Sequence, residues 1–198
     1  MKNIVAWLAS LGCITALLFA AETNTPRKAP ELAFTVPGQG QKLLSQYHGK
    51  VVALEFIFTT CPHCQAASRV MTKFQQEFGS RGFQALDIAI NDNADLLVDN
   101  FIKDYQVGFP VGWTPKEQML TFMGFSLAER FVVPQLVLID RKGIIRYQTP
   151  PLANDAAYGK LMAEDAIRQH IEELLSQGNS AAGHGSSAAK VAVAKKSS

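Results

Sequence analysis

The feature that most constrains this chain is a pair of cysteines two residues apart, directly after an apolar run. Residues 51–58 read Val-Val-Ala-Leu-Glu-Phe-Ile-Phe, and two threonines separate them from Cys61-Pro62-His63-Cys64. A short run rich in β-branched and aromatic residues predicts a strand buried on both faces. Pro62 suits the first turn of a helix, where its missing N–H costs nothing. The sequence therefore predicts that the cysteines lie between a core strand and the start of a helix.

Strands and helices alternate along most of the chain. A tight turn at residues 141–143 joins the last two strands into an antiparallel hairpin. This order predicts an α/β fold with a mixed central sheet flanked by helices. The expected strands are residues 51–58, 83–90, 135–140 and 144–147, with a short irregular strand from Phe109. The expected helices are residues 62–78, 94–105, 116–125 and 156–176, the first with an apolar stripe of Ala67, Val70, Met71, Phe74 and Phe78.

Both ends of the chain differ in composition from its middle. Residues 1–21 combine a basic start, an uncharged apolar run and alanines at the exit. This pattern indicates either a signal peptide cut after Ala20 or Ala21 or an N-terminal membrane anchor, and both predict a periplasmic or otherwise extracytoplasmic protein. Residues 22–31 are expected to be a linker and 32–176 the folded domain. Residues 177–198, rich in Gly, Ser, Ala and Lys, are expected to form a disordered tail.

The two cysteines of the domain indicate redox chemistry rather than a structural bridge. The third cysteine, Cys13, belongs to the export segment, so only Cys61 and Cys64 remain in the exported part. A disulfide between them would close a very small loop and would stabilise the fold weakly. At a helix start, free N–H groups and the helix dipole favour a thiolate. Cys61 is therefore expected to attack, and Cys64, one helical turn on and more buried, to resolve the mixed disulfide.

Two further residues are candidates for tuning this chemistry. His63 can donate a hydrogen bond or a positive charge toward Cys61, which would make the disulfide more oxidising; the alternative is an exposed helix residue without a role. Glu55 interrupts the apolar strand, and acids are rarely buried unless they are paired or functional. Beneath the cysteines Glu55 would exchange a proton with Cys64, whereas at a sheet edge it would only reach solvent.

Three stretches of the sequence occur in the order that a known family shows. They are the run from Gly49 to Cys64, the Val133-Pro134 pair and the run from Leu138 to Ile145. Together they resemble the TlpA/ResA-like branch of the thioredoxin superfamily over about residues 32–175. The resemblance implies a thioredoxin-like fold with the branch's TlpA-type insertion. It also implies protein thiol–disulfide oxidoreductase activity without a bound cofactor or metal.

The same resemblance implies roles for individual residues. Pro134 corresponds to a cis proline that faces the redox pair, and the Val133 backbone corresponds to a segment that pairs with an extended partner chain. Glu55 falls where many thioredoxins carry a buried acid. The insertion, with Trp113 and residues 116–125, is expected either to shape a groove for the partner or to pack in the core.

Two features depart from the usual pattern of the family. Thr60 stands where a tryptophan usually precedes the first cysteine, which removes a flat apolar surface beside Cys61. The Pro-His dipeptide between the cysteines is that of the strongly oxidising DsbA-type enzymes, whereas many members of the TlpA/ResA-like branch are reductants. The direction of electron flow therefore stays open.

Proteins are the expected partners of this chain. A formal net charge of +2 gives little attraction to nucleic acid. We expect a monomer that acts on protein thiols or disulfides and exchanges electrons with a membrane or soluble redox partner. It would be tethered to the membrane if the N-terminal segment is kept. The alternative function is a module that handles copper or another soft metal through Cys61, Cys64 and His63. A peroxidase on the same fold would need one exposed cysteine rather than a close resolving pair.

Overall fold

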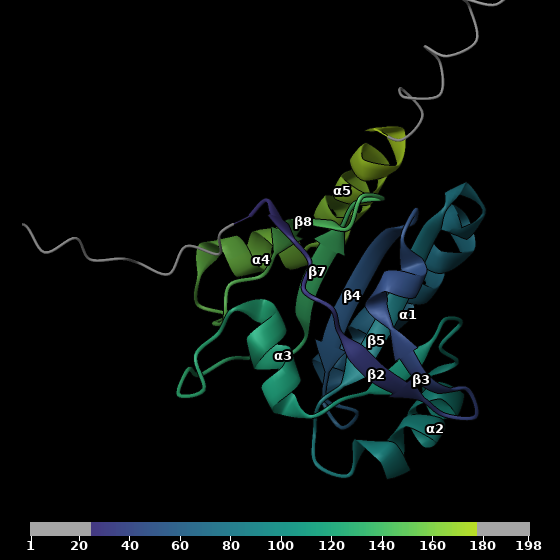
Figure 1. Ribbon diagram of the computed structural model, residues 1–198, viewed down its shortest axis with the longest axis vertical. Coiled ribbons are helices and arrows are strands. Elements are labelled where there is room, and N and C mark those ends of the chain that lie inside the picture. The colour runs from purple at the N-terminus through teal and green to yellow at the C-terminus, as the bar shows by residue number, and fades with distance from the viewer. Residues whose placement is uncertain (1–24, 178–198) are drawn as a thin grey trace, which may run out of the picture.

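The computed structural model describes residues 25–177, which form one mixed β-sheet and the helices that pack on it (Figure 1). The sheet has eight strands in the order β1-β8-β7-β4-β5-β6-β2-β3. At its centre β4 (Val51–Ile57), β5 (Phe83–Ala89) and β6 (Val111–Trp113) run parallel. Next to β4, the hairpin of β7 (Gln135–Ile139) and β8 (Ile144–Gln148) runs antiparallel. The mixed sheet expected from the sequence is confirmed.

Three edge strands add to the sheet expected from the sequence. Strands β2 (Ala33–Val36) and β3 (Gly40–Leu43) form a hairpin beside β6, and β1 (Arg27–Lys28) pairs with β8. Strand β1 lies inside the segment expected to be a linker. These strands have two to four residues, and only β2 shows alternating burial, so their sequences carry too short a pattern for recognition.

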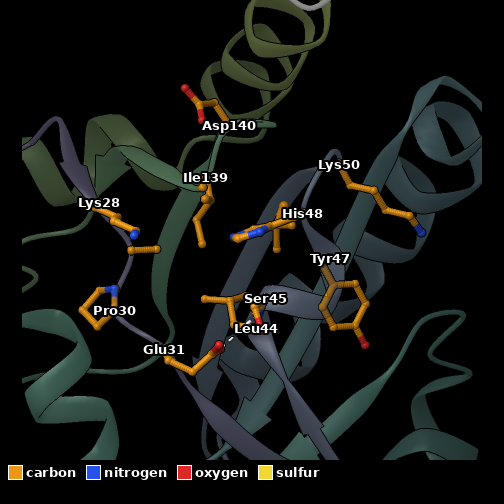
Figure 2. A pocket seen from close by; sticks show the side chains of 13 residues that line it. Lys28, Pro30, Glu31, Leu44, Ser45, Tyr47, His48, Lys50, Ile139 and Asp140 are labelled. Atoms are coloured by element: carbon orange, nitrogen blue, oxygen red, sulfur yellow. Dashed lines mark hydrogen bonds between the residues drawn. The ribbon is translucent and has the colours of Figure 1, made fainter.

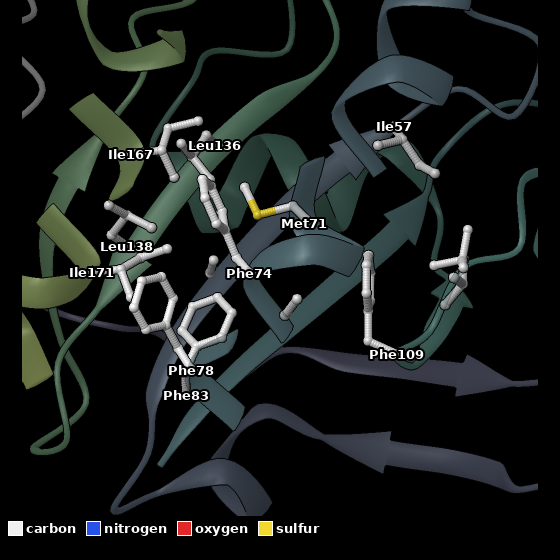
Figure 3. Packing of buried hydrophobic residues seen from close by; sticks show 14 of the residues in the cluster. Ile57, Met71, Phe74, Phe78, Phe83, Phe109, Leu136, Leu138, Ile167 and Ile171 are labelled. Atoms are coloured by element: carbon white, nitrogen blue, oxygen red, sulfur yellow. The ribbon is translucent and has the colours of Figure 1, made fainter. Parts of the chain in front are cut away.

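Helices cover both faces of the sheet. On one face α1 (Pro62–Phe78), α2 (Ala94–Tyr105) and α5 (Glu164–Gln177) pack on the central strands, and α3 (Lys116–Met123) covers the other face. Figure 3 shows Phe74 and Phe78 of α1 packed with Phe83 of β5 and Ile171 of α5. A short 3-10 helix, Leu44–Tyr47, follows β3, and another, Gly79–Arg81, follows α1. No helix within residues 25–177 is long and apolar enough to cross a membrane. The expected export segment and nearly all of the expected tail lie outside this range.

The single last helix expected over residues 156–176 is wrong, because the chain forms two helices there. Helix α4 (Ala156–Met162) ends where Ala163 takes an extended conformation, with φ −66° and ψ 132°. Helix α5 then begins with Glu164 and Asp165, and acidic residues in a first turn are stabilised by the helix dipole. Only α5 has buried residues, so an apolar stripe in the sequence could predict α5 but not α4.

The expected apolar stripe of α1 is wrong in its first half. The buried side chains of this helix are Cys64, Ser68, Met71, Phe74 and Phe78. Ala67 and Val70 are instead only half-buried and line a surface groove beside the cysteines. Ser68 takes the buried position because its hydroxyl finds hydrogen-bond partners inside the protein.

Candidate redox site

Cys61 lies at the start of α1, directly after the turn that follows β4. It is the N-cap residue, with an extended backbone, and Pro62 is the first residue of the helix. The Cys61 N–H donates to Phe58 O at 3.0 Å, and the Cys61 carbonyl accepts from the Gln65 N–H at 3.1 Å. Asn91, which follows β5, accepts from the Thr59 N–H at 2.9 Å and fixes the turn. The Cys61 thiol is half-exposed at this junction of turn and helix.

The two cysteines are free thiols in very different surroundings. Cys64 is fully buried, whereas Cys61 reaches solvent. Burial raises the pKa of the Cys64 thiol far above its ordinary value, and the neighbouring Cys61 and Glu55 raise it further. The thiols are close enough to share a hydrogen bond. An accessible sulfur above a buried, protonated one is the arrangement expected for an attacking and a resolving thiol.

The Val133-Pro134 segment faces Cys61 across the site. Its peptide bond is cis, and the Val133 carbonyl oxygen lies 3.9 Å from the Cys61 sulfur. Hydrogen bonds hold the segment from behind: the Gln135 side chain donates to Val132 O at 2.8 Å, and the Tyr158 hydroxyl donates to Pro134 O at 2.7 Å. The Val133 N–H has no acceptor within residues 25–177. One backbone donor beside the reactive sulfur is therefore available to another chain.

A mostly apolar groove of about 610 Å³ runs beside the cysteines. Its walls are the exposed side of the first turns of α1, the segment before β7 and part of α4. The lining residues are His63, Ala66, Ala67, Val70, Val132, Val133, Pro134, Ala153, Tyr158 and Met162. The exposed His63 therefore lies at the junction of the groove and the cysteine pair.

The insertion packs in the core and does not line this groove. Helix α3 buries four residues against the sheet, and Trp113 is half-buried against the core on the α1 face. Neither belongs to the lining of the groove. Of the two expectations for the insertion, the structure therefore favours core packing.

Glu55 is buried in the centre of the sheet, so the alternative of an acid at a sheet edge is wrong. It points to the α1 face of β4, and burial together with a neighbouring acid raises its pKa well above the ordinary range. That neighbour is Asp87, directly opposite on β5 and equally buried. Burial raises the pKa of Asp87 to about 7, although the Ser68 hydroxyl donates to its Oδ2 at 2.5 Å.

Asp87 and Ser68 were not expected from the sequence to belong to the site. A signal for Asp87 exists: it interrupts the apolar strand at residues 83–90 as Glu55 interrupts its own strand. What the sequence could not supply is the register, which sets the two acids side by side. Ser68 carries no signal of its own, because a serine on a helix is ordinarily exposed.

The described residues do not favour the metal-handling alternative. Between residues 25 and 177 no three histidine, cysteine or acidic side chains are grouped so that they could hold a metal ion.

A second, smaller hollow of about 210 Å³ lies at the opposite end of β4, away from the cysteines. Figure 2 shows His48 and Lys28 turned toward it and Lys50 turned away. It has no direct connection to the thiols.

Several sequence relatives of this chain are thiol-disulfide oxidoreductases named ResA. The one from Oceanobacillus iheyensis is 35% identical over 68 residues, which are 34% of this chain and 35% of that protein. The one from Bacillus thuringiensis is 27% identical over 59% of this chain and 64% of the relative. The chain thus spans less than two thirds of these two relatives. The one from Geobacillus thermodenitrificans is 25% identical over 84% of this chain and 89% of the relative.

Solved structures show the same fold. A thioredoxin-family thiol:disulfide interchange protein from Chlorobium tepidum superposes with a TM-score of 0.61 at 21% identity, over 77% of this chain and 98% of the other. The thioredoxin domain of a thiol-disulfide oxidoreductase from Bacteroides vulgatus gives 0.58 at 16% identity, over 76% and 99%. The expected thioredoxin-like fold is confirmed.

A family model covers the strand, the cysteine pair and the helix that follows it. The model of the AhpC/TSA family matches residues 25–148, from β1 through the cysteine pair to β8. Together with the ResA relatives, this match confirms the resemblance to the TlpA/ResA-like branch. On this match over more than half of its length, the chain belongs to the AhpC/TSA family.

Proposed function

We propose that this protein is an extracytoplasmic thiol–disulfide oxidoreductase that exchanges disulfides with partner proteins through Cys61 and Cys64. One observation carries the proposal: a half-exposed thiol at a helix start stands above a buried thiol of raised pKa and faces the Val133 carbonyl. Its ResA relatives bear the name of this activity. The signal-like residues 1–21 support a location outside the cytoplasm, where a membrane or soluble partner would renew the pair.

Two sulfur exchanges make up the proposed cycle. The Cys61 thiolate attacks a sulfur of the substrate disulfide, a Cys61–substrate bond forms and one substrate thiolate leaves. The Cys64 thiol then loses its proton, and its sulfur attacks Cys61 and expels the second substrate thiolate. The substrate is reduced and the pair is oxidised. With a substrate dithiol, the same steps run in reverse.

Two side chains tune these exchanges. Glu55 lies close enough to Cys64 for its charge to raise the thiol's pKa, and it accepts the Cys64 proton during resolution. His63, in the first turn of α1, stabilises a thiolate at Cys61 by its charge when protonated, which makes the disulfide more oxidising.

Substrate recognition uses the segment before β7 and the groove beside it. An extended substrate strand pairs with the free N–H of Val133, while its apolar side chains enter the groove. Pro134 holds this edge in place beside Cys61. The residues that line the groove all come from one chain, and we propose that the protein acts as a monomer.

A redox titration tests the proposed function. After equilibration in glutathione buffers, we expect one reversible two-electron transition, with a potential between about −270 and −120 mV. A value near the upper bound assigns the protein as an oxidant and one near the lower bound as a reductant. Tight stoichiometric copper uptake without a reversible transition would overturn the proposal and support the metal-handling alternative.

Tyr158→Phe is expected to weaken exchange with protein substrates. It removes the hydrogen bond that holds Pro134, a loss of about 1 kcal/mol in a segment that must be positioned for docking. The exchange rate with a disulfide-bonded peptide should fall about fivefold, while alkylation of Cys61 by a small reagent stays unchanged. Tyr105→Phe, outside the groove, is the matched control. Equal losses in both assays would show that the hydroxyl acts on the thiol and not on docking.

A further inference from the structure

Two acids face each other in the core below the cysteines. Glu55 and Asp87 are directly opposite in the parallel register of β4 and β5, on the α1 face, and neither is exposed to solvent. No ion pair within residues 25–177 involves either one. Three of their four carboxyl oxygens have no hydrogen-bond partner within these residues. Two uncompensated charges at this spacing are prohibitively costly, so a proton shared between the carboxyl groups is the favourable arrangement.

The fourth oxygen links the acids to the helix that carries Cys64. The Ser68 oxygen lies 2.5 Å from Asp87 Oδ2 and 3.0 Å from the Cys64 carbonyl oxygen. A hydroxyl has a single proton to donate. When Asp87 is ionised, Ser68 donates to it; when Asp87 is protonated, Asp87 donates to Ser68, and Ser68 is free to donate to the Cys64 carbonyl. The protonation state of Asp87 is thus coupled to the first turn of α1.

We propose that Glu55 and Asp87 act as one acid–base unit that holds a single shared proton, and that Asp87 is the positioning residue that sets the pH at which this unit accepts the proton of Cys64. The inference deepens the proposed function and rests on it. Asp87 touches no reacting atom in this scheme. It acts through Glu55, by the single proton that the two opposite carboxyl groups share.

The proton balance of the resolving step includes this unit. Cys64 gives its proton to the singly protonated pair, which then carries two protons and no charge. The Cys64 sulfur forms a bond with Cys61, the bond between Cys61 and the substrate breaks, and the substrate leaves as a thiolate. In the reverse direction the doubly protonated pair returns one proton to the departing Cys64 thiolate. The negative charge therefore passes from the pair to the Cys64 sulfur and leaves with the substrate thiolate, and in the reverse direction it arrives with that thiolate and returns to the pair.

Few other groups near the pair can titrate. Helix α1 contributes Cys61 and Cys64, and α4 contributes Tyr158, whose hydroxyl senses the same charges. Strand β7 places Leu136 beside Glu55. The side chains that α2 and α5 bury on this face are all apolar. A pH dependence of resolution that changes on substitution of Asp87 therefore reports on the pair.

The pH profile of resolution tests the inference. Cys61 is loaded with thionitrobenzoate, and the rate at which Cys64 expels this coloured thiol is followed by stopped flow across pH. In the singly protonated pair the remaining proton stabilises the ionised carboxyl, and Asp87→Asn removes the partner that shares it, so the midpoint of the rate profile should move to higher pH by about one unit. Glu55→Gln should slow expulsion by about tenfold or more and remove this step from the profile. Asp99→Asn, on the exposed side of α2, should leave the profile unchanged.

The unsubstituted protein provides a second, independent readout. At neutral pH its infrared spectrum should contain a carboxylic-acid C=O band, which Glu55→Gln removes. Absence of this band, or an unshifted midpoint in Asp87→Asn, would overturn the shared proton while leaving the proposed function intact. If expulsion persisted in Cys64→Ser, the proposed function itself would fail.

Discussion

Replacing Cys61 by serine should reduce disulfide exchange to the uncatalysed background, whereas replacing Cys64 by serine should leave a protein that captures substrates and cannot release them. The serine hydroxyl does not attack disulfides at neutral pH, because only a thiolate is a competent nucleophile here. Cys64 cannot take over, since it is fully buried and its pKa is strongly raised. In Cys64→Ser the Cys61 mixed disulfide has no internal thiol to resolve it.

The measurement is an exchange assay combined with mass spectrometry of the trapped adducts. Both variants are made in a Cys13→Ser background, so that no thiol other than Cys61 and Cys64 contributes. We expect one substrate per molecule bound to Cys61 in Cys64→Ser, released by dithiothreitol. Retained exchange in Cys61→Ser, or adducts on Cys64, would reverse the roles proposed for the two thiols.

The strand and helix around the cysteines were predictable because local and tertiary preferences agree there. The bounds of α1 follow from Pro62 at its start and glycine at its end, and those of α2 from its apolar spacing. Strand β4 is buried over its whole length, as its continuous apolar run predicts. Consistent signals of this kind fix an element without knowledge of its neighbours.

The remaining features depend on contacts between segments far apart in the sequence. The break at Ala163 separates two helices with different surroundings: α5 packs on the sheet, whereas α4 lines the groove beside the cysteines. Ala67 and Val70 follow a core-like spacing yet line the groove, since the segment before β7 leaves that side of α1 open. The closeness of Asp87 to Glu55 needs the register of β4 against β5, which no local pattern encodes.

The carboxyl pair should also lower the free energy of unfolding as pH rises, and replacing one of the two acids should remove this loss of stability. Burial raises the pKa values of Glu55 and Asp87 in the folded protein, so the folded state binds more protons than the unfolded state. The stabilising contribution of the Asp87 proton is complete below its ordinary pKa of 3.8 and is lost as pH rises through about 7. Stability should therefore fall across this range.

Asp87→Asn is accordingly expected to stabilise the protein in alkaline solution. A pKa raised from 3.8 to about 7 corresponds, at about 1.36 kcal/mol per pH unit, to an upper bound of roughly 4 kcal/mol. Because an asparagine keeps the bond to Ser68 and can donate to Glu55, we expect a gain of roughly 2 kcal/mol at about pH 8 and almost none at about pH 4. Urea unfolding at both pH values measures this, with Asp99→Asn as control. A variant that is less stable than the unsubstituted protein at the higher pH would show that the pair stabilises the core and that its buried charge does not destabilise it.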